Sequence, residues 1–299
     1  MSYRYHTADV FTDSPFGGNQ LAVLPDARGL SDAQMQAIAR EFNYSETVFV
    51  FPPDNPSHTR KLRIFTPGGE LPFAGHPTVG TAHVLAEIGE IALSGYETRI
   101  VFEEGAGPVP VLIRARDGRP AFAQLGAPRP PESRSDGFDP ATIAGVLSLR
   151  AEDIDDSYPI EAVSVGVPFL MVPIRTLEAL GRARIDGSKW SAALEKTWAP
   201  ETFLFTRTGD SEFRARMFAP TMGIIEDPAT GSACACFGAY LASRDLSRDG
   251  TRRYTVHQGV EMGRPSLLEV EADVAGGEVT AVRVGGATVL IASGELHVV

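Results

Sequence analysis

Short runs of alternating apolar and polar residues dominate the chain and predict many β-strands with few helices. In the first half of the chain these strand-like runs are 3–10, 20–24, 47–51, 61–65, 99–102 and 109–114. One stretch, residues 32–41, predicts a short helix with Ser31 as its N-cap. A more apolar helix is expected at residues 77–88, closed by Gly89.

This pattern recurs in the second half of the chain. The sequence RIFTP at 63–67 matches RMFAP at 216–220, and upstream ETVFV at 46–50 matches ETFLF at 201–205. A third pair of blocks aligns Pro77 with Pro228: GHPTVGTA at 75–82 against EDPATGSA at 226–233. Three matches in the same order indicate an internal duplication whose period is far too long for a solenoid.

The duplication predicts two similar domains, at residues 1–130 and 140–299. Residues 128–139 are rich in Pro and polar side chains, so they are expected to form the linker. One apolar helix in each half, surrounded by strands, predicts an α+β fold in which a sheet curls around a central helix. The last predicted strand, 288–292, lies beyond the repeat, so it can return to pair with the first domain.

Each apolar helix is expected to begin beside a polar residue. Because proline is favoured at the first helical position, Pro77 and Pro228 place His76 and Asp227 at or next to an N-cap, with the second helix at 228–242. Considered singly, Asp227 is explained as a helix cap and His76 as a hydrogen-bonded turn residue. Considered as a pair facing one another across a cleft between the domains, the two helix starts suit an anionic ligand.

The residues around these helix starts favour proton transfer on such a ligand. Gly75 and Gly231 allow a ligand to approach the backbone closely. Thr81 and Ser232 occupy matching positions in the aligned blocks and each offers a hydroxyl group. Two different polar groups at symmetric positions suit a reaction in which one group removes a proton and another returns it.

The same residues resemble the phenazine-biosynthesis F (PhzF-like) family across both halves of the chain. The matching segments are Asp9–Thr12 with Gly18 and Asn19, Ser45–Val50, Phe65–Pro67, Phe73–Thr78 and Glu226–Ala233. The resemblance implies a diaminopimelate-epimerase-like fold: two pseudo-symmetric domains, each a barrel-like and mostly antiparallel sheet around a central helix, with the site between them. It also implies a cofactor-free isomerase, often a homodimer, that acts in biosynthesis on a small anionic metabolite bearing a carboxylate.

The resemblance further implies the residues that act. It assigns the proton shuttle to Glu46, with His76, Asp227 and Ser232 assisting, and the substrate contacts to Asn19, Gly75, Pro77, Thr81, Gly231 and Ala233. Without the resemblance, Glu46 is an ordinary carboxylate at the end of a strand. Its repeat counterpart, Glu201, is expected to be structural.

Two departures from the family pattern bear on the chemistry. Gln20 follows Asn19 where relatives commonly carry proline. The epimerase and racemase branches carry cysteines at the two helix starts, but here Cys234 and Cys236 lie inside the second helix. A two-thiol mechanism is therefore not expected, and the cysteines are interpreted as small core residues.

Composition excludes several other classes of function. The chain of 299 residues has a net charge of −11, which disfavours a nucleic-acid partner. It shows no signal peptide and no apolar run long enough to span a bilayer, so a cytoplasmic protein without a membrane partner is expected. The histidines lack ligand-like spacing and no dinucleotide-binding glycine motif is present, so neither a metal nor a cofactor is predicted.

Three functions remain open from the sequence. The first is the isomerase that moves a proton between two carbons. The second is an epimerase or racemase that acts at one carbon, and the third is a non-catalytic protein that binds a small anion. Exchange of substrate hydrogen with solvent, with or without a shifted double bond, separates the first two, and binding without exchange favours the third.

Overall fold

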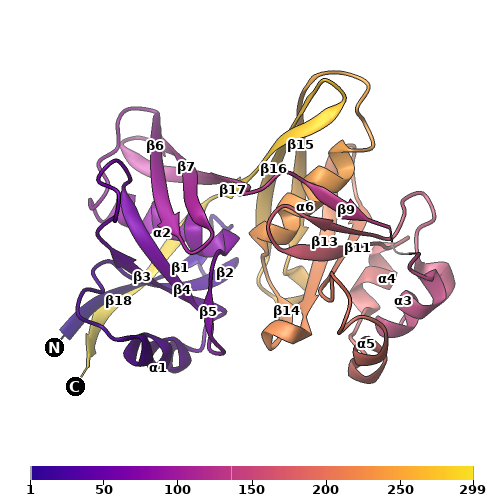
Figure 1. Cartoon of the computed structure of the whole chain (residues 1–299), viewed down its shortest axis with the longest axis horizontal. Coiled ribbons are helices and arrows are strands. Elements are labelled where there is room, and N and C mark those ends of the chain that lie inside the picture. The colour runs from indigo at the N-terminus through magenta and orange to yellow at the C-terminus, as the bar shows by residue number, and fades with distance from the viewer. Residues whose placement is uncertain (1, 136, 299) are drawn as a thin grey trace. The chain divides into compact units, whose positions relative to one another are not determined.

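The computed structural model describes residues 2–135 and 137–298, which divide into two compact units. Unit 1 runs to Pro128 and resumes at Val284, whereas unit 2 spans Arg129–Arg283. Both units are dominated by strands, and each contains one helix surrounded by them, α2 in unit 1 and α6 in unit 2 (Figure 1). The predicted α+β class is confirmed.

Unit 1 carries two helices among its strands. Its elements are β1 (Ser2–Val10), β2 (Asn19–Leu24), α1 (Asp32–Phe42), β3 (Glu46–Phe51), β4 (Arg60–Phe65), β5 (Glu70–Leu71), α2 (Gly75–Glu87), β6 (Glu97–Glu104), β7 (Gly107–Arg116), β8 (Arg119–Gly126) and β18 (Thr288–His297). The side chain of Ser31 caps α1 as predicted, in a capping box with Gln34.

Unit 2 repeats this plan with additional short helices. Its elements are β9 (Glu132–Arg134), α3 (Pro140–Val146), β10 (Glu161–Ser164), β11 (Pro168–Pro173), α4 (Leu177–Arg182), α5 (Gly187–Ala193), β12 (Thr202–Arg207), β13 (Glu212–Ala219), β14 (Ile224–Asp227), α6 (Gly231–Ala242), β15 (Gly250–Gln258), β16 (Ser266–Ala275) and β17 (Glu278–Gly286). Three 3-10 turns, at Ala151–Asp153, Pro220–Met222 and Val260–Met262, complete the unit.

The strand pairings of the two units follow the same order. In unit 1, β1–β2 is antiparallel, β2–β3 parallel, β3–β4 antiparallel, β4–β6 parallel and β6–β7 antiparallel. In unit 2, β10–β11, β11–β12, β12–β13, β13–β15 and β15–β16 show the same sequence of orientations. The duplication read from the sequence is therefore a duplication of topology.

The boundaries between the units differ from the sequence prediction. Part of the predicted linker, Glu132–Arg134, forms β9 and pairs with β10 inside unit 2. The chain beyond Val284 belongs to unit 1, where β18 pairs antiparallel with β1 from Ser2 to Val10. A predicted second domain at residues 140–299 is thus corrected at both ends, and the final strand does return to unit 1.

The central helices are buried on every side, as expected of helices that are apolar all round. All residues of α2 from Gly75 to Ala86 are buried. The strands approach so closely that a Cβ atom on Gly80 would lie 2.5 Å from the Val10 side chain, and one on Gly238 of α6 would lie 2.4 Å from Val270. Glycine at these two positions lets each helix pack directly against its sheet.

A pair of Arg–Glu bridges fixes the strand that leads into each central helix. Arg63 on β4 makes two parallel bonds to Glu70 on β5, of 2.7 and 2.6 Å. Arg216 on β13 repeats this with Glu226 on β14, at 2.7 and 2.8 Å. Arg216 is 2% exposed and also donates to the carbonyl groups of Leu180 and Ala183. Both bridges use the fork geometry that favours arginine over lysine.

The buried bridge is expected to matter more for stability than the exposed one. Arg216→Ala should lower the free energy of unfolding by about 3–5 kcal/mol, because it leaves the Glu226 carboxylate and two backbone carbonyls without their donor. Arg63→Ala, in the more exposed bridge, should cost about 1 kcal/mol or less. Urea unfolding of both variants measures the difference, and equal losses would contradict this ordering.

Buried His83 is expected to make the free energy of unfolding depend on pH in the acidic range. Burial lowers the pKa of His83 on α2 to about 4, whereas an unfolded histidine titrates near 6.5. Below about pH 6.5 His83 binds a proton in the unfolded chain but not in the folded chain. The free energy of unfolding is therefore highest above that pH and falls toward pH 4. His83→Gln should flatten this part of the stability curve, whereas the same change at exposed His297 should leave it unaltered.

Candidate active site

Three of the predicted site residues lie together in unit 1. His76, the second residue of α2, places its Nε2 atom 3.3 Å from Oε2 of Glu46, the first residue of β3. On the other side of the ring, Nδ1 of His76 lies 3.2 Å from the Nδ2 atom of Asn19, at the start of β2. The exposed fractions of Glu46, His76 and Asn19 are 8%, 4% and 1%. The fold therefore gathers a carboxyl group, an imidazole and an amide around the start of α2.

The imidazole in this cluster is neutral at physiological pH. Burial lowers the pKa of His76 to about 3, and a hydrogen bond with the backbone of Gln20 opposes that shift only in part. When Nδ1 accepts from the Asn19 amide, the ring proton resides on Nε2, the nitrogen that lies 3.3 Å from Glu46. His76 is thus suited to orient and assist Glu46 as an uncharged hydrogen-bonding group.

The start of α2 leaves its first N–H groups without a side-chain cap. The N-cap residue is Ala74, in an extended conformation, and it has no side chain able to accept from the first turn. Gly75 and Pro77 complete this first turn and are both buried. The uncapped turn and its helix dipole favour negative charge next to Glu46 and His76.

The predicted residues of unit 2 surround the start of α6. Asp227 ends β14, and its Oδ2 atom accepts a 2.5 Å hydrogen bond from the hydroxyl group of Thr230, the N-cap of α6. The side-chain amide of Gln258 donates to the Asp227 carbonyl at 2.8 Å and to the Thr230 hydroxyl at 3.1 Å. Ser232 is the second residue of the helix and is only half-buried.

The structure corrects the alignment of the two helix starts. Helix α6 begins at Gly231, three residues after Pro228, and Pro77 is the third residue of α2. Gly75 therefore corresponds to Gly231, and His76 corresponds to Ser232. The prediction that Asp227 matches His76 is wrong, because three residues separate strand from helix in both units: Pro228 follows β14 as Pro72 follows β5, so Asp227 corresponds to Leu71.

The proposed match between Thr81 and Ser232 fails for the same reason. Thr81 lies six residues beyond Gly75 along α2 and is fully buried. Ala233 lies at the third position of α6 and is likewise buried, whereas the preceding Ser232 is half-buried. At the second position of the central helix, unit 1 therefore has a histidine where unit 2 has a serine.

Two residues of these clusters were not found from the sequence. Glu104 ends β6 and lies against the start of α2, and Gln258 ends β15 and lies against the start of α6. Extending the repeat past the helices would have aligned the ends of these two strands. Their burial against the two helix starts, which distinguishes them from other polar residues, is visible only in the folded chain.

The cysteines lie in the core, as predicted. Cys234 and Cys236 are free thiols with no exposed surface, and burial raises the pKa of Cys236 to about 12 and that of Cys234 well above its ordinary value. Thiols that resist ionisation are poor nucleophiles. Among residues 2–135 and 137–298, no group of three or more histidine, cysteine or acidic side chains has the geometry of a metal site.

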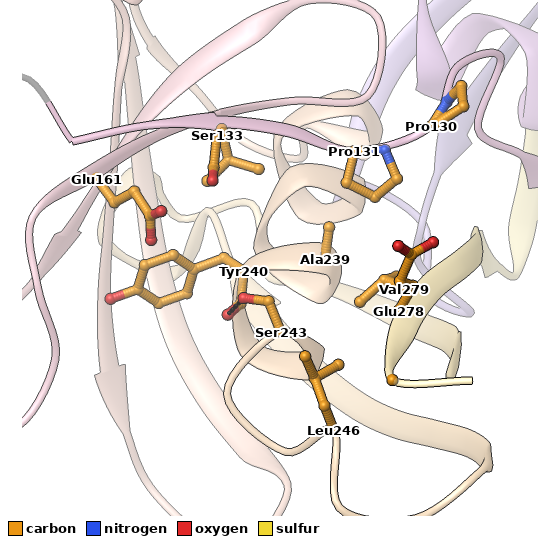
Figure 2. Close-up of a pocket in the computed structure, with 12 residues that line it drawn as sticks. Pro130, Pro131, Ser133, Glu161, Ala239, Tyr240, Ser243, Leu246, Glu278 and Val279 are labelled. Carbon is orange, nitrogen blue, oxygen red and sulfur yellow. Dashed lines mark hydrogen bonds between the residues drawn. The ribbon is translucent and has the colours of Figure 1, made fainter. Parts of the chain in front are cut away.

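A cavity of about 390 Å³ in unit 2 lies away from all of these residues. It follows the C-terminal part of α6 around Ala239, Tyr240 and Ser243, with Glu161 and Pro131 on its other side (Figure 2). The hydroxyl group of Tyr240 donates to the Pro159 carbonyl, and Glu161 pairs with Arg244. These two polar side chains thus already have partners outside the cavity lining, and none of the predicted catalytic residues lines it. No helix in the described part of the chain is both long and apolar enough to cross a membrane.

Comparisons with known proteins agree with the geometry. A family model described as phenazine biosynthesis-like protein matches residues 8–294. An uncharacterised isomerase of Mesorhizobium japonicum is 42% identical, over 98% of both chains. The trans-2,3-dihydro-3-hydroxyanthranilate isomerase of Pseudomonas aeruginosa is 35% identical, over 99% of both chains.

A solved structure extends the match to three dimensions. The phenazine biosynthesis protein of the PhzF family from Bacillus anthracis superimposes over the full length of both chains, with a TM-score of 0.89 and 26% identity. The expected diaminopimelate-epimerase-like architecture is thereby confirmed. Full-length matches in sequence and structure lead to one conclusion: the chain belongs to the phenazine biosynthesis-like (PhzF) protein family, and it is an isomerase.

Proposed function

We propose that the protein moves a proton between two carbon atoms of a small carboxylate-bearing metabolite, with Glu46 as the group that carries the proton. The contact that supports this most directly is the 3.3 Å approach of the Glu46 carboxyl to the neutral ring of His76. A carboxylate that removes a proton from carbon and returns it to another carbon needs no cofactor.

The proposed reaction conserves atoms and charge. Glu46 takes a proton from one carbon, and the electron pair of that C–H bond shifts into the neighbouring double bond. The negative charge then spreads over the conjugated system of the substrate, where the uncapped N–H groups of α2 stabilise it. The protonated Glu46 next delivers its proton to the carbon at the far end of that system, and the double bond has moved.

The remaining predicted residues receive supporting roles. His76, held by Asn19, orients the Glu46 carboxyl, and its Nε2–H group is the donor available to Glu46. Asp227 and Ser232, at the start of α6, are proposed to act on the same substrate, with Gly75 and Gly231 offering backbone contacts. The relative from Pseudomonas aeruginosa is named for trans-2,3-dihydro-3-hydroxyanthranilate, a ring with a carboxylate, so this compound is the first substrate to test.

Replacing Glu46 should abolish turnover. Glu46→Gln keeps the size of the side chain but removes its ability to carry a proton, so we expect kcat to fall by about 10³-fold or more. Ultraviolet absorbance during incubation with trans-2,3-dihydro-3-hydroxyanthranilate measures the rate. Undiminished turnover would remove Glu46 from the mechanism.

Glu201 offers a matched control for this substitution. It precedes β12 at the position that corresponds to Glu46, is 1% exposed, and binds the hydroxyl group of Thr221. Burial raises the pKa of Glu201 to about 7. Because Glu201 is expected to be structural, Glu201→Gln should preserve turnover. Loss of activity in both variants would indicate a shared structural cause.

Isotope transfer should distinguish the isomerase from an epimerase. Glu46 is only 8% exposed, and in the proposed reaction the proton that it removes is the one that it returns. Substrate deuterated at the donor carbon should therefore yield product with part of the deuterium at the acceptor carbon, detected by NMR. Complete replacement by solvent hydrogen at one unchanged carbon would instead support epimerisation, and binding without any exchange would support a non-catalytic protein.

A further inference from the structure

Glu104 and Gln258 occupy equivalent places in the two units. Each is the last residue of the strand that follows the central helix, β6 in unit 1 and β15 in unit 2. Gln258 accepts a 3.2 Å hydrogen bond from the backbone N–H of Thr230, the N-cap of α6. Glu104 interacts in the same way with the backbone N–H of Ala74, the N-cap of α2. Both side chains therefore hold the first turn of a central helix.

The equivalence extends to the fourth residue of each helix. In α6 this residue is Cys234, whose thiol lies 3.9 Å from Oε1 of Gln258. In α2 it is Thr78, whose hydroxyl oxygen lies 2.6 Å from Oε1 of Glu104. A carboxyl group in unit 1 thus replaces the uncharged amide that unit 2 uses for the same contacts.

Counting protons around Thr78 shows which form of Glu104 fits. The Thr78 hydroxyl oxygen also lies 2.7 Å from the Ala74 carbonyl oxygen, but a hydroxyl group has only one proton to donate. If Glu104 is ionised, two acceptors compete for that proton. If Glu104 carries a proton, it donates to Thr78, and Thr78 donates to Ala74, just as the Gln258 amide donates to the hydroxyl of Thr230.

Beyond these donors and the dipole of α2, no charged side chain stabilises a negative charge on Glu104. Its side chain is 8% exposed, and its Oε2 atom has no hydrogen-bond partner among the described residues. Burial raises the pKa of Glu104 to about 8, against smaller opposite effects of Thr78 and the Ala74 N–H, and no charged side chain contributes to the shift.

The charged and titratable groups on the elements packed around Glu104 have partners elsewhere or lie further along their element. They are His76, His83 and Glu87 on α2, Arg60, Lys61 and Arg63 on β4, Glu70 on β5, Arg114 and Arg116 on β7, and Glu97, Arg99 and Glu103 on β6. Arg60, Lys61 and Arg63 bind Glu90, Asp54 and Glu70, respectively. Glu103, the neighbour on the same strand, binds His58.

We propose that Glu104 is a positioning residue that works as an uncharged carboxylic acid, holding the first turn of α2, and with it His76, as Gln258 holds the first turn of α6. This role rests on the proposed function only in so far as the start of α2 serves catalysis. Nothing in it requires Glu104 to touch the substrate.

Ionisation of Glu104 then limits the protein at alkaline pH. In the unfolded chain this glutamate titrates at about 4.5, and in the folded chain at about 8. The folded state thus prefers the protonated form, so the contribution of Glu104 to stability is fully present below pH 4.5 and is lost as the pH rises through 8. At pH 9 only about one molecule in ten keeps the proton that joins Glu104 to Thr78.

Glu104→Gln provides the decisive comparison, because an amide copies the protonated acid and cannot ionise. Between pH 7 and pH 9, kcat/KM of the wild type for trans-2,3-dihydro-3-hydroxyanthranilate should fall about tenfold more than that of Glu104→Gln. Both proteins should have similar activity at pH 7. Glu103→Gln, on the opposite face of the same strand, should keep the wild-type profile.

Two measurements test the role without any substrate. The free energy of unfolding should decline between about pH 5 and 8 in the wild type and stay flatter in Glu104→Gln. In protein labelled with ¹³C-glutamate, one carboxyl resonance that Glu104→Gln removes should titrate near pH 8.

The outcomes separate this proposal from the proposed function. Absence of turnover together with a carboxyl group titrating near pH 8 would count against the function and support the role of Glu104. A Glu104 carboxyl already ionised at pH 7, a Glu104→Gln protein that fails to fold, or identical alkaline profiles in both proteins would overturn the role of Glu104.

Discussion

Complete burial of one apolar helix in each unit is the constraint on which the rest of the structure depends. A helix that packs against strands on all sides has no water at its first turn, so the N–H groups there need partners from the protein or from a ligand. In α2 and α6 the last residue of the following strand meets part of this need. The groups left over form a polar and anion-attracting spot at the start of each helix.

Burial also sets the charges at the start of α2. His76 is kept neutral because the surrounding protein does not solvate an imidazolium ion, and Glu104 behind it is held as the uncharged acid for the same reason. In the proposed function Glu46 carries the proton, and the neutral ring of His76 lies 3.3 Å from its carboxyl group. Proton transfer to and from carbon benefits from uncharged neighbours that orient the group that carries the proton.

The duplicated topology shows how one plan supports different side chains at corresponding positions. The Arg–Glu bridges before the helices and the glycines at the first helical position are retained in both units. Where chemistry is proposed, the units differ: His76 corresponds to Ser232, and Glu104 to Gln258. Retained contacts support the helix start, whereas the differing residues give it its chemical character.

The sequence by itself determined the duplication, the strand-rich α+β class and the candidate His76 at a helix start, because alternating patterns and short motifs are local properties of the chain. Glu46 became a candidate only through the resemblance to the PhzF-like family. It did not determine the register of the two helix starts, since Pro77 lies inside α2 whereas Pro228 lies in the segment before α6, which begins at Gly231. It also did not reveal that Asn19 binds His76 or that Glu104 supports α2, because these residues are far apart in the sequence and meet only when the strands pair. Tertiary structure alone decided the burial of these groups, and burial is what fixes their protonation and therefore their possible roles.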